Sequence, residues 1–169
     1  GSPTMHPNLV NELTYFARKK GIFITMETEG SHFVPTDHPI GLISLSPKFS
    51  NSVPQMGATT PQGKEVDERM IKQHNKFRLN GDAIRKTLDY HSDYHYKPVW
   101  DGTEETLKEI ELFRGLASIP KNKTWIMPAG DTREELQKMY PKTMEMCIKE
   151  GYNFTGREHI IAYGDKREV

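Results

Sequence analysis

Apolar residues recur at two spacings along the chain and divide it into helical and extended segments. Leu9, Leu13 and Phe16 follow a helical spacing that ends in three cations and a glycine, which predicts a helix near the N-terminus. Branched and aromatic residues at 22–27 predict a buried strand. A second short strand is predicted at 41–46.

The rest of the chain continues this alternation after a long segment rich in Pro, Ser, Gly and Gln at 47–67. A loop of that length is typical of a functional or a disordered segment. Residues 66–91 then predict two short helices, broken at Asn80-Gly81. The later predicted elements, in chain order, are a strand at 94–100, a helix at 101–116, a strand at 123–128, a helix at 131–150 and a strand at 158–164.

Capping residues mark the ends of the later helices. Either Asp101 or Thr103 can cap the first of them. Asp131 and Glu134 have the spacing of a capping box, and Gly151 is the expected end of that helix.

Two prolines limit these elements. Pro98 would remove one ladder donor, so we expect it near the end of its strand. Pro141 should kink the helix at 131–150.

Strands that alternate with amphipathic helices predict an α/β fold with mostly parallel strand pairing and right-handed crossovers. The pattern leaves open an open doubly wound sheet or an arc of a (β/α) barrel. In both arrangements ligands bind where the carboxyl ends of the strands meet the following loops.

Composition narrows the class of protein. The 169 residues fit one domain, and 23 basic against 23 acidic residues give a net charge of +0. Bulk attraction to nucleic acid or to an anionic membrane is therefore not expected. The sequence contains neither an apolar run of the roughly 20 residues that cross a bilayer nor a leader, so we expect a cytoplasmic protein.

Polar residues follow several predicted strands. The Glu27 carboxylate could accept hydrogen bonds from ribose hydroxyls or from an ammonium group. Ser44 and Ser46 share one face of their strand, and Lys48 follows a proline; hydroxyls with a cation suit a carboxylate or a ribose. The segment 127–131 places Pro and Gly before a helix N-terminus, which favours anions only weakly, because ordinary βα loops share this feature.

Other chemical signals are weaker. His91 and His95 are spaced i, i+4, but no third metal ligand lies nearby in sequence, so a metal site is not expected there. The Gly63-Lys64 pair lacks the remaining residues of a P-loop. The one cysteine, Cys147, is interpreted as a small buried apolar residue rather than a nucleophile.

Five segments together resemble the radical S-adenosylmethionine superfamily, and within it 7-carboxy-7-deazaguanine synthase and its relatives in 7-deazapurine (queuosine-type) biosynthesis. The resemblance covers nearly the whole chain apart from about 53–90. Its segments are "GSPTMHPNLVNEL", similar to a Gly-Gly-Glu-Pro-Thr stretch before a helix, "ITMETEG", "ISLSPKFSNS", "WIMPAGDTREEL" and the tail "GYNFTGREHIIAYGDKREV".

The resemblance implies a partial (β/α) barrel of the radical S-adenosylmethionine type with outer helices. It also implies site residues. The residues expected to line the S-adenosyl-L-methionine pocket are Gly1, Ser2, Pro3, Thr4, Glu27, Ser44, Ser46 and Lys48. Arg157 and His159 are expected to face the substrate. No catalytic residue and no metal ligand is assigned within the chain.

The implied reaction is a lyase ring contraction that converts 6-carboxy-5,6,7,8-tetrahydropterin to 7-carboxy-7-deazaguanine with loss of ammonia. A 5′-deoxyadenosyl radical starts it, with a [4Fe–4S] cluster and Mg²⁺ as further cofactors. The family also implies a homodimer that acts on a small pterin-type molecule, with neither nucleic acid nor membrane as a partner.

Three departures qualify the resemblance. Ser2 stands where the family has glutamate, so either this subgroup differs or Gly1-Ser2 is not natural sequence. Glu168 replaces a tail glycine, and a helical insertion at about 65–90 has no counterpart.

The cluster is the largest departure. A Cys-x3-Cys-x2-Cys loop needs three thiolates, and the chain has one cysteine. We therefore expect 1–169 to be the C-terminal portion of a longer radical enzyme, inactive alone, with cluster ligands outside it.

Two alternatives stay open at this point. The chain could belong to a radical enzyme of another reaction class, such as an activase that generates a glycyl radical. It could also be a non-catalytic α/β binding module that has no cluster.

Overall fold

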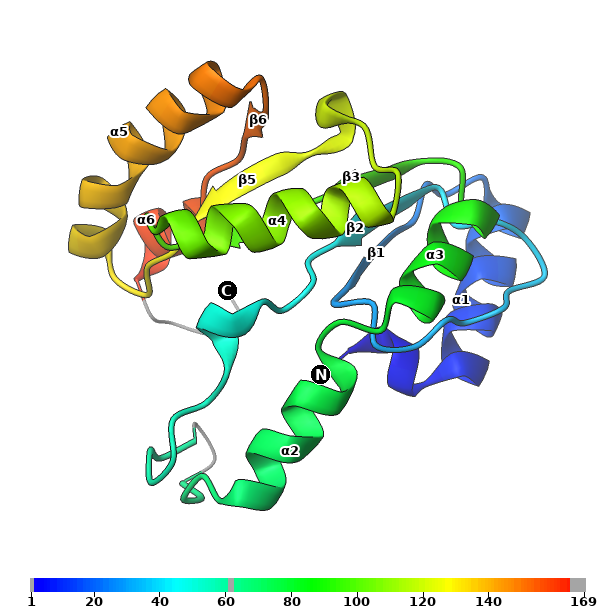
Figure 1. Cartoon of the computed structure of the whole chain (residues 1–169). Helices are drawn as coiled ribbons and strands as arrows, with labels where there is room; N and C mark the ends of the chain where they lie inside the picture. The colour runs from blue at the N-terminus through cyan, green and yellow to red at the C-terminus, as the bar shows by residue number, and fades with distance from the viewer. Residues whose placement is uncertain (1, 61–62, 165–169) are drawn as a thin grey trace. The chain divides into compact units, whose positions relative to one another are not determined.

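The computed structural model describes residues 2–60 and 63–164, which form a mixed α/β structure (Figure 1). The chain divides into two compact units, Gly1–Tyr94 and His95–Val169. The alternation of helices and strands predicted from the sequence is confirmed.

The first unit opens with a short 3-10 helix, η1 (Pro3–Met5), and helix α1 (Pro7–Lys20). α1 ends at Gly21, whose φ of 66° gives the left-handed C-cap that the sequence predicts. Its buried face is small and consists of Val10, Thr14 and Ala17. The apolar side chains that define the helical spacing are about half exposed: Leu9, Leu13 and Phe16.

Three strands form the sheet associated with this unit, in the order β1 (Thr25–Thr28), β2 (Leu42–Leu45) and β3 (Tyr94–Tyr96). β1 and β2 are parallel, as predicted. The side chains of Ile43 and Leu45 are fully buried, so β2 carries the core of this unit.

Helices α2 (Glu68–Phe77) and α3 (Gly81–Tyr90) follow the long loop, and the predicted break between them is confirmed. The carboxylate of Asp67 caps α2 by accepting a hydrogen bond from the Met70 N–H at 2.7 Å. Asn80 caps α3 through its side-chain oxygen.

Gly30 fixes the bend by which the chain leaves β1. Its φ is +81°, and a Cβ there would lie 2.5 Å from Ile84 of α3 and 2.9 Å from Leu45. Its N–H donates to the Thr28 hydroxyl at 3.0 Å. Only glycine fits both the conformation and the close approach of α3.

The second unit has a three-stranded sheet in the order β4 (Val99–Trp100), β5 (Trp125–Pro128) and β6 (Asn153–Phe154). Both of its pairings are parallel. Its helices are α4 (Glu104–Leu116), α5 (Arg133–Glu150) and α6 (Glu158–Tyr163). α5 packs along β5 and β6.

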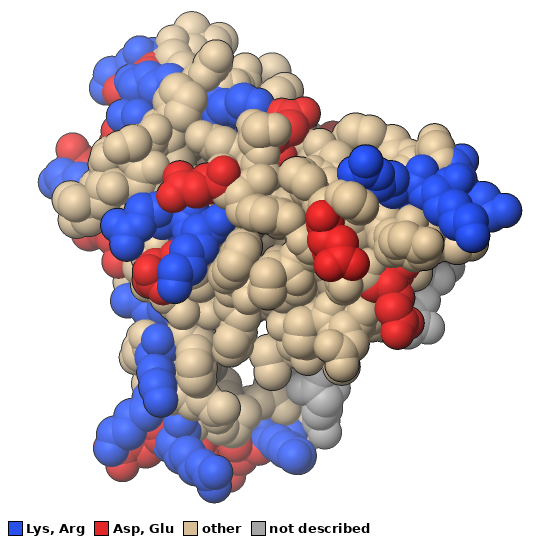
Figure 2. All heavy atoms as spheres, turned by 90° about the vertical axis from the view of Figure 1, so that its right-hand side faces the viewer, with Lys and Arg blue, Asp and Glu red and all other residues tan. Residues whose placement is uncertain are grey.

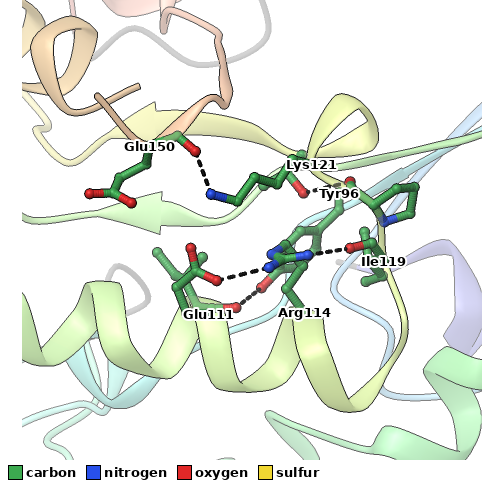
Figure 3. A network of polar contacts seen from close by, with 9 residues as sticks. Tyr96, Glu111, Arg114, Ile119, Lys121 and Glu150 are labelled. Carbon is green, nitrogen blue, oxygen red and sulfur yellow. Dashed lines mark hydrogen bonds and ion pairs between the residues drawn. The ribbon is translucent and has the colours of Figure 1, made fainter. Parts of the chain in front are cut away.

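A polar network joins α4 to the segment before β5 (Figure 3). Arg114 of α4 donates to the Ile119 carbonyl at 2.8 Å and to Glu111 at 3.0 Å. The buried Tyr96 hydroxyl donates to the carbonyl of Ile110 at 3.4 Å. These bonds fix the position of α4 within the second unit, relative to Tyr96 and to the segment before β5.

Two strand predictions are wrong in detail. The strand predicted at 94–100 is two strands, β3 and β4, because Pro98 interrupts the ladder in the middle rather than at the end. The strand predicted at 158–164 is helix α6, since Asn153–Phe154 already occupies the place beside β5.

The capping prediction for α5 is wrong by one residue. The capping box consists of Thr132 and Glu135, not of Asp131 and Glu134. Gly151 ends α5 with a φ of 75°, as predicted, and Pro141 lies inside that helix. For α4 the structure selects Thr103 as the cap, and Asp101 supports it by accepting from the Thr103 hydroxyl at 2.7 Å.

The two sheets are short, and no closed barrel forms among residues 2–60 and 63–164. None of the described helices has the length and apolar character to cross a membrane. On the face that Figure 2 shows, basic side chains lie among acidic ones, in keeping with the balanced composition.

Candidate functional site

A cavity of about 490 Å³ lies in the first unit where the chain leaves β1 and β2. We call it the α2 pocket, because one face of α2, from Met70 to Arg78, forms a wall of it. The residues after the strands that line it are Glu29, Ser31, His32 and Lys48, with Met5 from η1. The predicted rule that ligand sites follow strand ends therefore leads to this cavity.

Glu29 provides the negative charge of the α2 pocket. Burial opposes its ionisation, but hydrogen bonds from Ser2 and Ser31 and the positive charge of Lys48 lower the pKa of the carboxyl below its usual value. The Ser31 hydroxyl donates to Oε1 of Glu29 and lies 2.9 Å from Nδ1 of His32. An ionised carboxylate held in this way can accept from a ligand ammonium or hydroxyl group.

Lys48 and Arg78 provide the cationic side of the pocket, and His74 lines the pocket with them. Burial, followed by the charges of Arg78 and Lys48, lowers the pKa of His74. Nδ1 of His74 is buried and has no hydrogen-bond partner among the described residues. The pocket therefore holds an unsatisfied polar atom beside two cations.

Apolar side chains complete the wall. Met5 and Met70 line the cavity, and Phe77 stacks on the His32 ring with 5.6 Å between ring centroids. A molecule with an apolar or aromatic body and polar groups at its ends matches this lining.

Several residues predicted from the sequence meet at this pocket. Lys48 lines it, and Ser2 hydrogen bonds to Glu29. The Ser2 and Thr4 hydroxyls are 2.8 Å apart, and Pro3 lies between them at the start of η1. Gly1, which was expected to contact the cofactor, lies outside the described residues.

The other cofactor-site predictions fall on neighbouring positions. Glu27 is exposed on β1 and pairs in register with Ser44, which is buried. Ser46 follows β2, and its N–H donates to the Thr28 carbonyl at 2.8 Å. None of these three lines the α2 pocket, and their role in binding stays a prediction.

Sequence reasoning missed Glu29 and the α2 residues. Glu29 stands two residues after Glu27 in the same quoted segment, so the strand-end rule could have selected either. The residues of α2 belong to the segment that was expected to be an insertion, and no motif marked them. Their face repeats at i, i+3, i+4 and i+7 and is formed by Met70, Gln73, His74 and Phe77.

The predicted substrate residues lie in the second unit. Arg157 caps the start of α6, and its Nη1 donates to the Gly130 carbonyl at 2.6 Å and to Asp131 at 3.4 Å. His159 is exposed on α6. Their contact with a substrate stays a prediction.

The described residues contain no group of three or more His, Cys, Asp and Glu side chains that could hold a metal ion. Cys147 is buried in α5, its thiol donates to the Asn153 carbonyl at 3.5 Å, and burial raises its pKa to about 11. One buried thiol cannot supply the three thiolates of an iron–sulfur cluster, so these residues do not fit that cofactor. They likewise offer no Mg²⁺ cluster.

Comparison with known proteins gives two matches along the chain. It is 28% identical over 167 residues to 7-carboxy-7-deazaguanine synthase of Rhodopirellula baltica, and 28% identical over 174 residues to the protein of that name from Halobacterium salinarum. The resemblance deduced from the sequence is confirmed. The matches cover 99% and 100% of this chain.

The chain spans 60% and 65% of the length of these two relatives. No family model matches the chain, and no solved structure matches it at a significant level.

Proposed function

We propose that this chain is part of a 7-carboxy-7-deazaguanine synthase-like lyase of 7-deazapurine (queuosine-type) biosynthesis. The observation that carries the proposal is the similarity to two such synthases along 99% and 100% of the chain. The α2 pocket supports it, because it lies after β1 and β2, where the sequence predicts the cofactor.

The proposed reaction converts 6-carboxy-5,6,7,8-tetrahydropterin to 7-carboxy-7-deazaguanine with loss of ammonia. S-adenosylmethionine would supply the radical that starts the ring contraction. The thiolates of a [4Fe–4S] cluster, and any Mg²⁺ cluster of carboxylates, would come from outside the described residues. The proposed complete enzyme is a cytoplasmic homodimer, and its two short sheets would form an arc of a (β/α) barrel.

The residues of the α2 pocket fit the amino-acid end of S-adenosylmethionine. Glu29, aligned by the Ser2 and Ser31 hydroxyls, would accept from the ammonium group. Lys48 would balance the carboxylate, and Met5 would pack on the thioether chain. Glu27, Ser44 and Ser46 would contact the remainder of the cofactor, and His159 would bind the substrate, with Arg157 fixing the loop at Gly130.

The test uses the product of the complete gene, purified and reconstituted without oxygen. We expect an iron–sulfur absorption band, cleavage of S-adenosylmethionine and formation of 7-carboxy-7-deazaguanine, followed by mass spectrometry. E29Q should lower turnover, and the exposed K72Q variant should not. If the complete protein forms a cluster but does not convert the pterin, it belongs to another reaction class of radical enzyme. If it forms no cluster, the interpretation as a non-catalytic binding module is favoured.

A further inference from the structure

Helix α2 belongs to the segment 65–90, which lies outside the five sequence motifs that carry the resemblance, and it forms a wall of the α2 pocket. It adds two nitrogen-bearing side chains, His74 and Arg78, one turn apart on the same helix. Residues at this spacing point to one side of a helix and can contact the same group.

Arg78 is held in place by main-chain and amide contacts, not by an acid. Its Nε donates to the Asn75 side chain at 2.9 Å, and Nη1 lies 3.5 Å from the Lys48 carbonyl. Among the described residues it has no carboxylate partner. A positioned guanidinium without an acid is ready to hold a planar anion.

The ring of His74 has an unsatisfied nitrogen. Its Nδ1 is buried and unpartnered in the described part of the chain. The charged and titratable groups that share the pocket with it are Arg78 on its own helix, Lys48 after β2, and Glu29 and His32 after β1. Two of these are cations and one is an anion, so an incoming anion meets an excess of positive charge near His74.

We propose that α2 gives the pocket a carboxylate-binding site, in which His74 and Arg78 together hold a carboxylate of a flat small molecule. The aromatic pair of Phe77 and His32 provides the apolar surface for its ring. His74 takes up a proton as the carboxylate binds, because the anion offsets the repulsion from Arg78 and Lys48, which adds to burial in lowering the pKa of the ring. The choice of a pterin-type carboxylate rests on the proposed function, whereas the choice of His74 and Arg78 rests on the lining of the pocket.

The test compares 6-carboxypterin with pterin, which lacks the carboxylate, by isothermal titration calorimetry on the chain. 6-Carboxypterin should bind more tightly, with proton uptake measured from buffers of different ionisation enthalpy. R78Q should weaken its binding roughly tenfold or more, because a charge-assisted hydrogen bond is lost, and should leave pterin binding unchanged. R78K should lie between, since lysine keeps the charge without the fork.

H74Q should abolish the proton uptake. K72Q is the matched control, because Lys72 is an exposed cation of α2 that pairs with Glu68 at 2.8 Å. Circular dichroism melts confirm that each variant is folded.

The proposal is overturned if pterin binds as tightly as 6-carboxypterin, if neither binds, or if K72Q weakens binding as much as R78Q. Proton uptake that survives in H74Q overturns the role of His74. Inorganic phosphate that displaces 6-carboxypterin at equal concentration would show a general anion site and overturn the carboxylate assignment. Each result is independent of whether the complete enzyme turns over.

Discussion

Nδ1 of His91, at the end of α3, accepts a hydrogen bond from the main-chain N–H of Ile40 at 3.0 Å. The imidazole is fully buried, and its Nε2 has no partner in the described part of the chain. Because Nδ1 accepts, the ring proton of the neutral form lies on Nε2. Burial lowers the pKa of His91, so the ring is neutral in the folded protein at neutral pH.

This geometry predicts a loss of stability in mild acid. The unfolded chain binds a proton at His91 near the usual pKa of 6.5, whereas the folded chain binds it only at lower pH. The free energy of unfolding should therefore fall as pH drops below 6.5, by up to about 1.4 kcal/mol for each pH unit from this group. Urea unfolding at a series of pH values measures the slope.

The control for this prediction is a pair of variants. H91Q removes the titration and should show a flatter profile below pH 6.5, although it should be less stable at neutral pH. H159Q changes an exposed histidine and should keep the slope of the parent protein. Equal slopes in all three proteins would refute the role of His91.

His91 also shows what the sequence could and could not establish. Its i, i+4 spacing with His95 is that of two metal ligands on a helix. A metal site was not predicted there, because no third ligand lies nearby in the sequence. The structure gives the physical reason for its position: the ring satisfies the Ile40 N–H across 51 residues. A contact between residues so distant in sequence leaves no periodic signal, so it could not be predicted.

Cys147 should be unreactive in the folded chain. Its side chain is buried, and a pKa raised from 9.0 to about 11 reduces the thiolate fraction at neutral pH by about a hundredfold. Ellman's reagent should label it slowly under native conditions and fully in denaturant. Rapid native labelling would show that α5 opens readily or that the thiol is exposed.

Thr132 should contribute more to stability than its neighbour Asp131. T132A removes the hydroxyl that caps α5 and should lower the free energy of unfolding by about 1 kcal/mol. D131A changes a side chain that is 93% exposed and should cost under about 0.5 kcal/mol. If D131A lowers the free energy of unfolding more than T132A does, Asp131 is the cap of α5, as the sequence first predicted.

That one-residue shift has a physical cause. Asp131 and Glu134 have the same spacing as Thr132 and Glu135, and both pairs fit the capping-box pattern. The choice depends on where the loop after β5 allows the first helical turn to begin. Local sequence therefore predicted the helix and its end at Gly151, but tertiary packing set its first residue.

Arg157 should stabilise the start of α6, because its side chain hydrogen bonds to the loop at Gly130. R157Q removes the hydrogen bond to the Gly130 carbonyl and should destabilise the chain by about 1 to 2 kcal/mol. Hydrogen exchange should accelerate at the α6 amides, such as the Gly164 N–H, and remain unchanged in α1. Equal acceleration in both helices would mean general destabilisation instead.

The strand-end rule found the region of the candidate site, because parallel strands place their following loops at one edge of a sheet. It selected Lys48, which lines the α2 pocket. Ser2, which hydrogen bonds to Glu29, was predicted from the family resemblance instead. The strand-end rule did not find His74 or Arg78. Their helix reaches the pocket only through the path of the loop at 47–67, which composition alone does not determine.

Gly30 has a consequence for the α2 pocket beyond its own conformation. The core side chain of Ile84 fixes the bend there, so the two residues on either side, Glu29 and Ser31, leave the backbone in set directions before any ligand arrives. A cation that binds the Glu29 carboxylate therefore does not have to order a flexible loop, and little binding free energy is lost to conformational entropy. Packing in the hydrophobic core thus sets the position of the polar residues Glu29 and Ser31 at the pocket.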